Sequence, residues 1–160
     1  MCLKFLTELP VEEIEALASS READASKRES QIRLAEEVTT LIHGEEGLKK
    51  AKLAGEVLFG AAISDLSDAD LNQIFADVPS AEFSAATLES EGLSLIDALA
   101  LTGLCKSKGE ARRTIKEGGA NVNNVRFDEI ETTLTAANKA SDSIIVLRRG
   151  KKKFALVKLV

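Results

Sequence analysis

The chain has 160 residues, 44% of them hydrophobic, which is enough for the buried core of one or two small domains. No apolar run approaches the roughly 20 residues of a membrane span, and two cysteines with one histidine cannot supply the usual four-ligand zinc site. The net charge is −5, but the charge is unevenly divided along the chain. Residues 103–160 carry 13 basic and 6 acidic side chains, or +7, whereas residues 1–102 carry 8 basic and 20 acidic side chains, or −12. This division indicates a polyanionic partner for the basic part.

Residues 1–78 are predicted to form a helical segment of three to four helices. Apolar residues recur there at helical spacing, and Ser26 with Glu29 makes a capping box for the second helix, which Gly44 ends. The expected helices span residues 10–19, 26–43, 45–59 and 67–75.

The third of these helices carries lysines on one face, at Lys49, Lys50 and Lys52. They could neutralise an RNA phosphate, but acidic neighbours favour a solvated face of mixed charge.

Residues 79–91 are rich in Ser, Ala and Glu with weak periodicity, and they are predicted to form a linker between two domains. A second domain is expected over residues 92–160. Its first helix, which carries the apolar residues of 95–101, is expected to pack against the helix that follows it.

That next helix has marked ends. Ser107 and Glu110 form an S-x-x-E capping box, and Gly118-Gly119 ends the helix because glycine takes the left-handed conformation without steric cost. The helix is predicted over residues 108–117. At about 100° per residue its outer side presents cations, with Lys108, Arg112 and Lys116 in one row and Arg113 further round. Spacing alone leaves a merely solvated face open as the alternative, whereas the charge division favours a phosphate contact.

A first hairpin is predicted directly after this helix. Asn123-Asn124 tolerates the positive φ angles of a two-residue turn, which would join strands over 120–122 and 125–127.

A second hairpin is predicted at the end, with strands 143–147 and 154–160 joined by a basic turn over 148–153. Its apolar face is expected to consist of Ile144, Val146, Phe154, Leu156 and Leu159. The turn is either a solubilising tip or a phosphate contact. We favour the contact because the turn lies in the same domain as the basic helix.

Three groups of residues resemble known RNA-binding proteins. Ser107, Lys108, Glu110, Ala111, Arg112, Ile115, Gly118, Val122 and Asn123 together resemble the RNA-binding module named after small-subunit ribosomal protein S-four. The ending Arg148-Arg149-Gly150-Lys151-Lys152-Lys153-Phe154 is similar to that of bacterial-type tyrosyl-tRNA synthetases. So is an upstream series: Gln31, Leu34 to Thr39, His43 to Glu46, and Leu58-Phe59. The resemblance covers nearly the whole chain.

The resemblance implies an α+β fold. Residues 1–78 would end an anticodon-binding region, and 92–160 would be an S-four-like domain whose helix pair packs on a short, mostly antiparallel sheet. It also implies a parent enzyme that activates tyrosine with ATP and transfers it to tRNA. Neither signature motif of that nucleotide-binding domain appears here, nor does a glycine-rich phosphate loop. This chain is therefore expected to be catalytically silent alone and to hold no cofactor, ATP belonging to an absent catalytic domain.

In this family the module grips the anticodon stem and long variable arm of tyrosine tRNA, so the resemblance implies that tRNA or another structured RNA binds here. The predicted RNA-binding residues are Lys106, Ser107, Lys108, Arg112, Arg113, Lys116, Asn123, Arg148, Arg149, Lys151, Lys152 and Lys153. Asn123 could add a directional hydrogen bond, although its turn role is favoured. Aromatic stacking should be minor, since Phe127 and Phe154 are expected in the core. No metal site is expected.

The chain departs from the family at two positions. Asn124 stands where the family usually has glycine after the turn asparagine, and Ala120 stands where a β-branched residue is usual. Asparagine tolerates the turn and alanine only weakens the strand, so the motif remains while its turn geometry is open.

Cys2 and Cys105 are interpreted as free thiols of a reducing compartment, which indicates the cytoplasm, with the mitochondrial matrix as the alternative. The chain is expected to be a monomer, and the parent enzyme a homodimer through its absent catalytic domain. Two other functions remain open. One is a free-standing ribosome-associated or intron-splicing RNA-binding protein. The other is a helical protein-protein module whose acidic half binds a partner.

Overall fold

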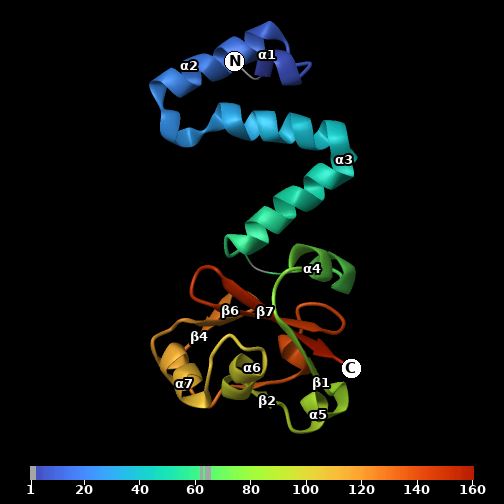
Figure 1. The fold of residues 1–160 in the computed structure, drawn as a ribbon, viewed down its shortest axis with the longest axis vertical. Coiled ribbons are helices and arrows are strands. Elements are labelled where there is room, and N and C mark those ends of the chain that lie inside the picture. Colours follow the sequence, from blue (N-terminus) through green and yellow to red (C-terminus); the bar gives the residue numbers. More distant parts are fainter. Residues whose placement is uncertain (1–2, 62, 64–65) are drawn as a thin grey trace. The chain divides into compact units, whose positions relative to one another are not determined.

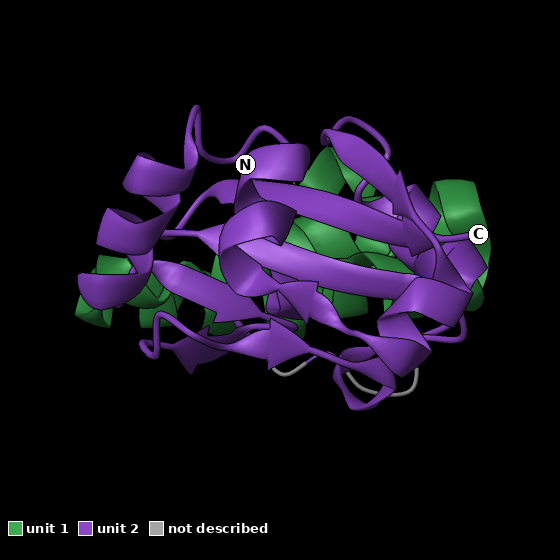
Figure 2. Cartoon of the chain, turned by 90° about the horizontal axis from the view of Figure 1, so that it is seen from below, with its two compact units in different colours: residues 1–54 green, residues 55–160 purple. Residues whose placement is uncertain are grey.

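The computed structural model describes residues 3–61, 63 and 66–160, and it has the expected α+β fold class (Figure 1). The chain divides into two compact units, residues 1–54 and 55–160 (Figure 2). Within the described ranges, no helix is both long enough and apolar enough to cross a membrane.

The first unit is helical. Its elements are α1 (Leu3–Leu6), α2 (Val11–Ala23), the 3-10 turn η1 (Ala25–Lys27) and most of α3 (Glu29–Leu58). Gly44 has a φ of 72° and breaks α3 into two helical stretches, which confirms the helix end predicted there.

The start predicted for the second helix is wrong. Ser26 lies inside η1, where its amide and hydroxyl donate to the Asp24 carboxylate at 3.0 and 2.6 Å, and α3 begins only at Glu29. Asp24 caps this turn because a carboxylate at the preceding position satisfies free amides as well as a serine does.

Ion pairs link the helical stretches of the first unit. Arg33 of α3 contacts Glu13 of α2 at 3.0 Å and Glu37 of its own helix at 3.0 Å. Across the break at Gly44, Lys52 lies 2.8 Å from Glu36. Lys52 is thus part of a face of mixed charge, as the sequence indicated for it.

The second unit is built on a five-stranded sheet. Its strands are β1 (Ser80–Phe83), β3 (Ala120–Val122), β4 (Val125–Phe127), β6 (Ile144–Arg149) and β7 (Lys153–Leu159). Their spatial order is β1-β7-β6-β3-β4, and only the β1-β7 pair is parallel. The expected mostly antiparallel sheet and both predicted hairpins are therefore confirmed. A separate pair joins β2 (Leu93–Ser94) to β5 (Thr133–Leu134).

Helices cover both faces of this sheet (Figure 1). On one face lie α5 (Ala85–Ser90), α6 (Leu95–Leu101) and α7 (Lys108–Lys116), and on the other lie the end of α3 and α4 (Asp68–Ile74). Successive residues of a strand point to opposite faces, so Ile145 and Leu147 pack under the first group while Ile144 and Val146 pack under the second. The helix pair predicted to pack on the sheet forms part of the first core. The apolar face predicted for the terminal hairpin lies in the second core, except for Leu159, which packs in the first.

The linker predicted over residues 79–91 is wrong. Residues 80–83 form β1, which pairs with β7, and Leu88 of α5 is 1% exposed in the first core. The compact unit that contains the sheet also begins at Gly55 rather than after residue 78. The composition of residues 79–91 suggested a linker because their local propensity for regular structure is weak. Tertiary contacts override that weak propensity and form β1 and α5.

Hydrogen bonds attach α4 to the sheet unit. The carboxylate of Asp68 accepts from the Ser143 hydroxyl at 2.6 Å, from the Ser143 amide at 3.2 Å and from the Ser141 hydroxyl. These bonds, with Ser141 first and Ser143 second, hold the pKa of Asp68 below its ordinary value.

Candidate nucleic-acid interface

Helix α7 begins where the sequence indicated. The Ser107 hydroxyl accepts from the Glu110 amide at 3.2 Å, which is the predicted cap. The Glu110 carboxylate reaches one residue further back than expected, accepting from the Lys106 amide at 2.7 Å. That bond and a second one from Arg149 lower the pKa of Glu110, so the carboxylate stays charged at the start of the helix. Gly118, with a φ of 69°, ends the helix.

The outer side of α7 carries the predicted cations. Ala111, Thr114 and Ile115 are buried against the sheet, which fixes the rotation of the helix. The basic residues on its other side and just before it are all exposed, namely Lys106, Lys108, Arg112, Arg113 and Lys116. Lys108 lies 2.7 Å from Asp97 of α6. The other four have no ion pair within the part of the chain that the structure describes.

The β6-β7 hairpin brings the second group of cations beside the end of α7. Its turn covers residues 150–152, shorter than the predicted 148–153, and Gly150 there has a φ of 62°. The Gly150 amide donates to the Gly119 carbonyl at 2.8 Å. Lys151, Lys152 and Lys153 are exposed on this hairpin, so both predicted basic groups belong to one unit.

Arg149 is engaged within the protein. It belongs to strand β6 rather than to the turn, and its guanidinium donates to the Leu104 carbonyl at 2.9 Å and lies 2.8 Å from Glu110. These contacts join β6 to the loop before α7 and to the first turn of α7.

Arg148 belongs to the opposite face of the sheet. Its guanidinium donates to Asn121 at 3.2 Å and lies 5.9 Å from the ring centroid of Phe154, a cation-π geometry. A side chain at Gly60 would lie 2.9 Å from it. Arg148 is thus half-buried between the sheet and the end of α3.

Asn123 has the turn role that the sequence favoured. Its φ is 49°, and its side-chain amide donates to the Asn138 carbonyl at 2.8 Å while its oxygen accepts from the Val146 amide at 3.0 Å. Both polar ends of the side chain therefore have partners inside the protein.

Asn124 makes side-chain hydrogen bonds that the usual glycine could not make. Its φ of 66° is that of the predicted turn, and its side-chain amide donates to the carbonyls of Val57 at 2.8 Å and Ala61 at 2.7 Å. The turn is thereby attached to the end of α3.

Arg126 is a basic residue that the site prediction omitted. It is exposed on edge strand β4, and its guanidinium lies against Gly118, where a side chain would come within 2.0 Å of it. Arg126 therefore adds a cation at the end of α7. The pairing of β4 with β3 opposite Asn121 brings it there, and no local motif indicates this.

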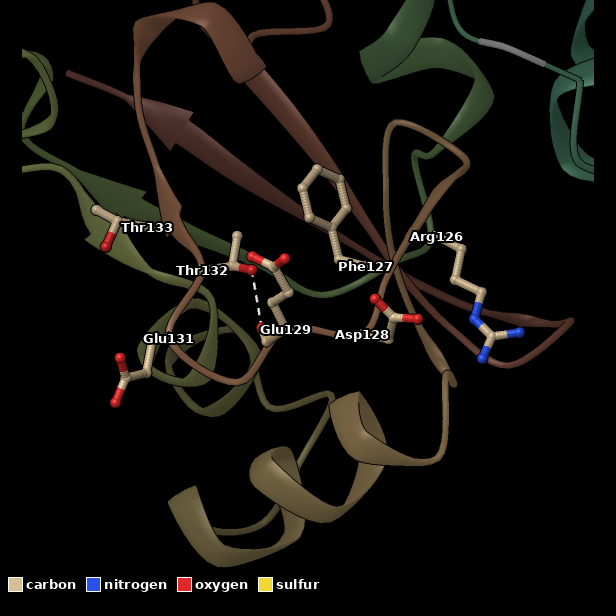
Figure 3. A pocket seen from close by; sticks show the side chains of 7 residues that line it. All are labelled: Arg126, Phe127, Asp128, Glu129, Glu131, Thr132 and Thr133. Carbon is tan, nitrogen blue, oxygen red and sulfur yellow. Dashed lines mark hydrogen bonds between the residues drawn. The ribbon is translucent and has the colours of Figure 1, made fainter.

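An acidic hollow follows Arg126 along the chain (Figure 3). Arg126 lies at one end of it and Thr133 at the other, and its lining includes the carboxylates of Asp128, Glu129 and Glu131. Anionic side chains therefore border the basic surface on the β4 side. Across the described residues, no group of three or more His, Cys, Asp or Glu could hold a metal ion.

Residues 70–157 match the family model described as the tyrosine-tRNA ligase SYY-like C-terminal domain. The chain belongs to this family. All twelve predicted site residues fall inside the matched residues of the tyrosine-tRNA ligase C-terminal domain.

Curated relatives extend the similarity to the whole chain. A tyrosine-tRNA ligase of Rhodopirellula baltica is 43% identical over 158 residues, which are 99% of this chain and 36% of the relative. Tyrosine-tRNA ligase 1 of Bacillus subtilis is 44% identical over 155 residues, 97% of this chain and 36% of the relative. The chain thus spans little more than a third of the length of these ligases.

Among solved structures, the chain is similar to one described as the solution structure of a tyrosyl-tRNA synthetase C-terminal domain. The two are 33% identical with a TM-score of 0.49, and the match covers 64% of this chain and 98% of the other.

Proposed function

We propose that this chain is the tRNA-binding C-terminal part of a tyrosine-tRNA ligase. Its role is to grip the anticodon stem and variable arm of tyrosine tRNA so that a catalytic domain outside this chain can attach tyrosine with ATP. One observation carries the proposal. The exposed cations of α7 and of the β6-β7 hairpin lie in one unit, inside the residues that match the tyrosine-tRNA ligase family.

The binding groups differ in how freely they can reach a phosphate. Those that are exposed and without an ion pair among the described residues are Lys106, Arg112, Arg113, Lys116, Arg126, Lys151, Lys152 and Lys153. Lys108 would have to exchange Asp97 for a phosphate. Arg148, Arg149 and Asn123 serve to hold the surface in shape, because each makes side-chain hydrogen bonds inside the protein.

The surface suits recognition of a backbone rather than of unpaired bases. The sequence has no Trp or Tyr, Phe154 is 6% exposed, and Phe127 packs against the core beneath α7. Stacking platforms for single-stranded bases are aromatic, whereas structured RNA is bound mainly through phosphates and sugars. A folded RNA is therefore the better ligand.

The remaining parts of the proposal concern the parent enzyme. ATP and tyrosine would bind its catalytic domain, through which it would form a homodimer, while this chain alone would be a monomer without a cofactor. We propose the cytoplasm as its location, with the mitochondrial matrix as the alternative.

The experiment compares two double variants in binding to a tyrosine tRNA transcript. Arg112→Ala with Arg113→Ala removes two exposed cations of α7 and should weaken binding at least tenfold. Lys49→Ala with Lys50→Ala removes the same charge from exposed positions of the first unit and should leave the affinity nearly unchanged. Equal effects of the two pairs would mean that only net charge matters, and the proposed surface would be wrong.

A further inference from the structure

Gly109 is the second residue of α7 and lies on the outer side of its first turn. Ala111, Thr114 and Ile115 define the buried side of this helix, and at about 100° per residue Gly109 points nearly opposite to them. It is exposed and has Lys108 before it and Arg112 and Arg113 one turn later.

Nothing inside the protein explains this glycine. Its φ is not in the left-handed region, and a side-chain carbon built there would meet only the Ser107 oxygen, at an unstrained 3.8 Å. By contrast, Gly118 has a φ of 69° and Arg126 against it. Glycine is the least favourable ordinary residue in a helix apart from proline, so a helix-forming side chain would stabilise α7. No contact or backbone conformation within the chain compensates for this low helix propensity of Gly109.

A glycine in such a place has one further physical use, which is to let another molecule approach the backbone closely. Arg112 and Arg113, one turn on from Gly109, are long cations whose charged ends would extend beyond the helix surface. The adjacent carboxylate of Glu110 is engaged by Arg149 and by the Lys106 amide. A strand that carries phosphates and lies on the backbone at Gly109 would have these cations on either side of it.

We propose that Gly109 is the point of closest approach between α7 and the sugar-phosphate strand of the bound RNA. A side chain there holds the strand away from the helix and lengthens its contacts with the flanking cations. This inference rests on the proposed function, and it adds that the fit to RNA is steric as well as electrostatic.

The test uses Gly109→Ala and Gly109→Leu in the full chain, with the tyrosine tRNA transcript as the probe. Both residues favour helix more than glycine does, so both variants should unfold at a temperature no lower than that of the parent chain. The dissociation constant should nevertheless rise about fivefold for alanine and further for leucine, because the larger side chain displaces the strand more.

Gly55→Ala is the matched control. Gly55 is also a helical glycine with ordinary φ, and a side chain there would meet nothing within 4 Å. Its replacement should likewise not lower the unfolding temperature, and it should leave the affinity for tRNA unchanged.

The outcomes separate this inference from the proposed function. If the parent chain binds the tRNA and the Arg112/Arg113 double variant loses it, while both Gly109 variants bind as well as the parent, the inference is wrong and the proposed function stands. If the parent chain shows no salt-sensitive binding at all, the proposed function itself fails. Weaker binding of the Gly109 variants without a loss of stability supports the inference, because loss of structure cannot then explain the loss of affinity.

Discussion

The guanidinium of Arg149, on strand β6, lies 2.8 Å from the carboxylate of Glu110, on the first turn of helix α7. The same guanidinium donates to the Leu104 carbonyl at 2.9 Å in the loop before the helix. Arg149 therefore fixes the helix that carries one set of cations to the strand that leads into the other set.

Replacing Arg149 with alanine should destabilise the fold by about 1 kcal/mol, because the carbonyl of the buried Leu104 loses its hydrogen-bond donor. Lys151→Ala, which removes an equal charge from the exposed turn, should not change stability. Urea unfolding of both variants measures the difference. An Arg149 variant as stable as the parent chain would show that this contact has no structural role.

Asn124→Gly should loosen the end of α3 while leaving the hairpin formed. Glycine accepts the left-handed turn conformation, but the hydrogen bonds to Val57 and Ala61 are lost. We expect stability to fall by about 1–2 kcal/mol. Hydrogen exchange should speed up at the last turn of α3 and stay slow in β3. Unchanged exchange throughout would contradict the attachment described for Asn124.

The stability contributed by Asp68 should depend on pH. Hydrogen bonds from Ser141 and Ser143 hold its pKa below the ordinary value in the folded state. A group whose pKa is lowered by folding stabilises the protein above the unfolded pKa of about 4, and that stabilisation is lost as pH falls through the folded pKa.

Asp68→Asn should therefore be less stable than the parent chain at pH 7, and the gap between them should close as the pH is lowered from about 5 toward 2. Thermal unfolding of both proteins across this range measures the gap. A gap of constant size would mean that the charge of Asp68 is not what matters.

Ser107→Ala removes the cap of α7. The loss should cost about 1 kcal/mol, the usual value for a serine at this position. Ser107→Asp should keep the cap, since its carboxylate can accept the same amide, but should bring a negative charge beside the proposed RNA surface. Thermal unfolding followed by circular dichroism should find the alanine variant less stable than the parent chain. Titration with tRNA should find that the aspartate variant has lost mainly affinity. Affinity losses of equal size in the two would argue against a purely structural role for Ser107.

Features that depend on neighbours in sequence could be predicted. The cap at Ser107, the end of α7 at Gly118 and the turn at Asn123-Asn124 each need only local hydrogen bonds or a positive φ, and all three are present. The exposed cations of α7 followed from the same helical spacing.

Features that depend on partners distant in the sequence could not be predicted. Residues 80–83 have little strand propensity, and they form β1 only because β7 pairs with them from more than 70 residues away. The engagement of Arg149 with Glu110 likewise depends on which face of β6 points at α7. That face is set by the pairing register, which a basic run in the sequence does not reveal.

The central claim is that the basic surface binds the phosphates of tyrosine tRNA, and a salt series tests it most directly. The affinity of this chain is measured for the tRNA with and without its variable arm. The logarithm of the affinity should fall linearly with the logarithm of the salt concentration, with a slope of about −0.7 to −0.9 per phosphate contacted. Eight exposed cations of the basic surface, Arg126 included, have no ion pair among the described residues, and they bound the slope at about −7. We expect the slope to be steeper when the arm is present. Equal binding to any structured RNA would leave only a generic basic surface, and no binding at low salt would contradict the account.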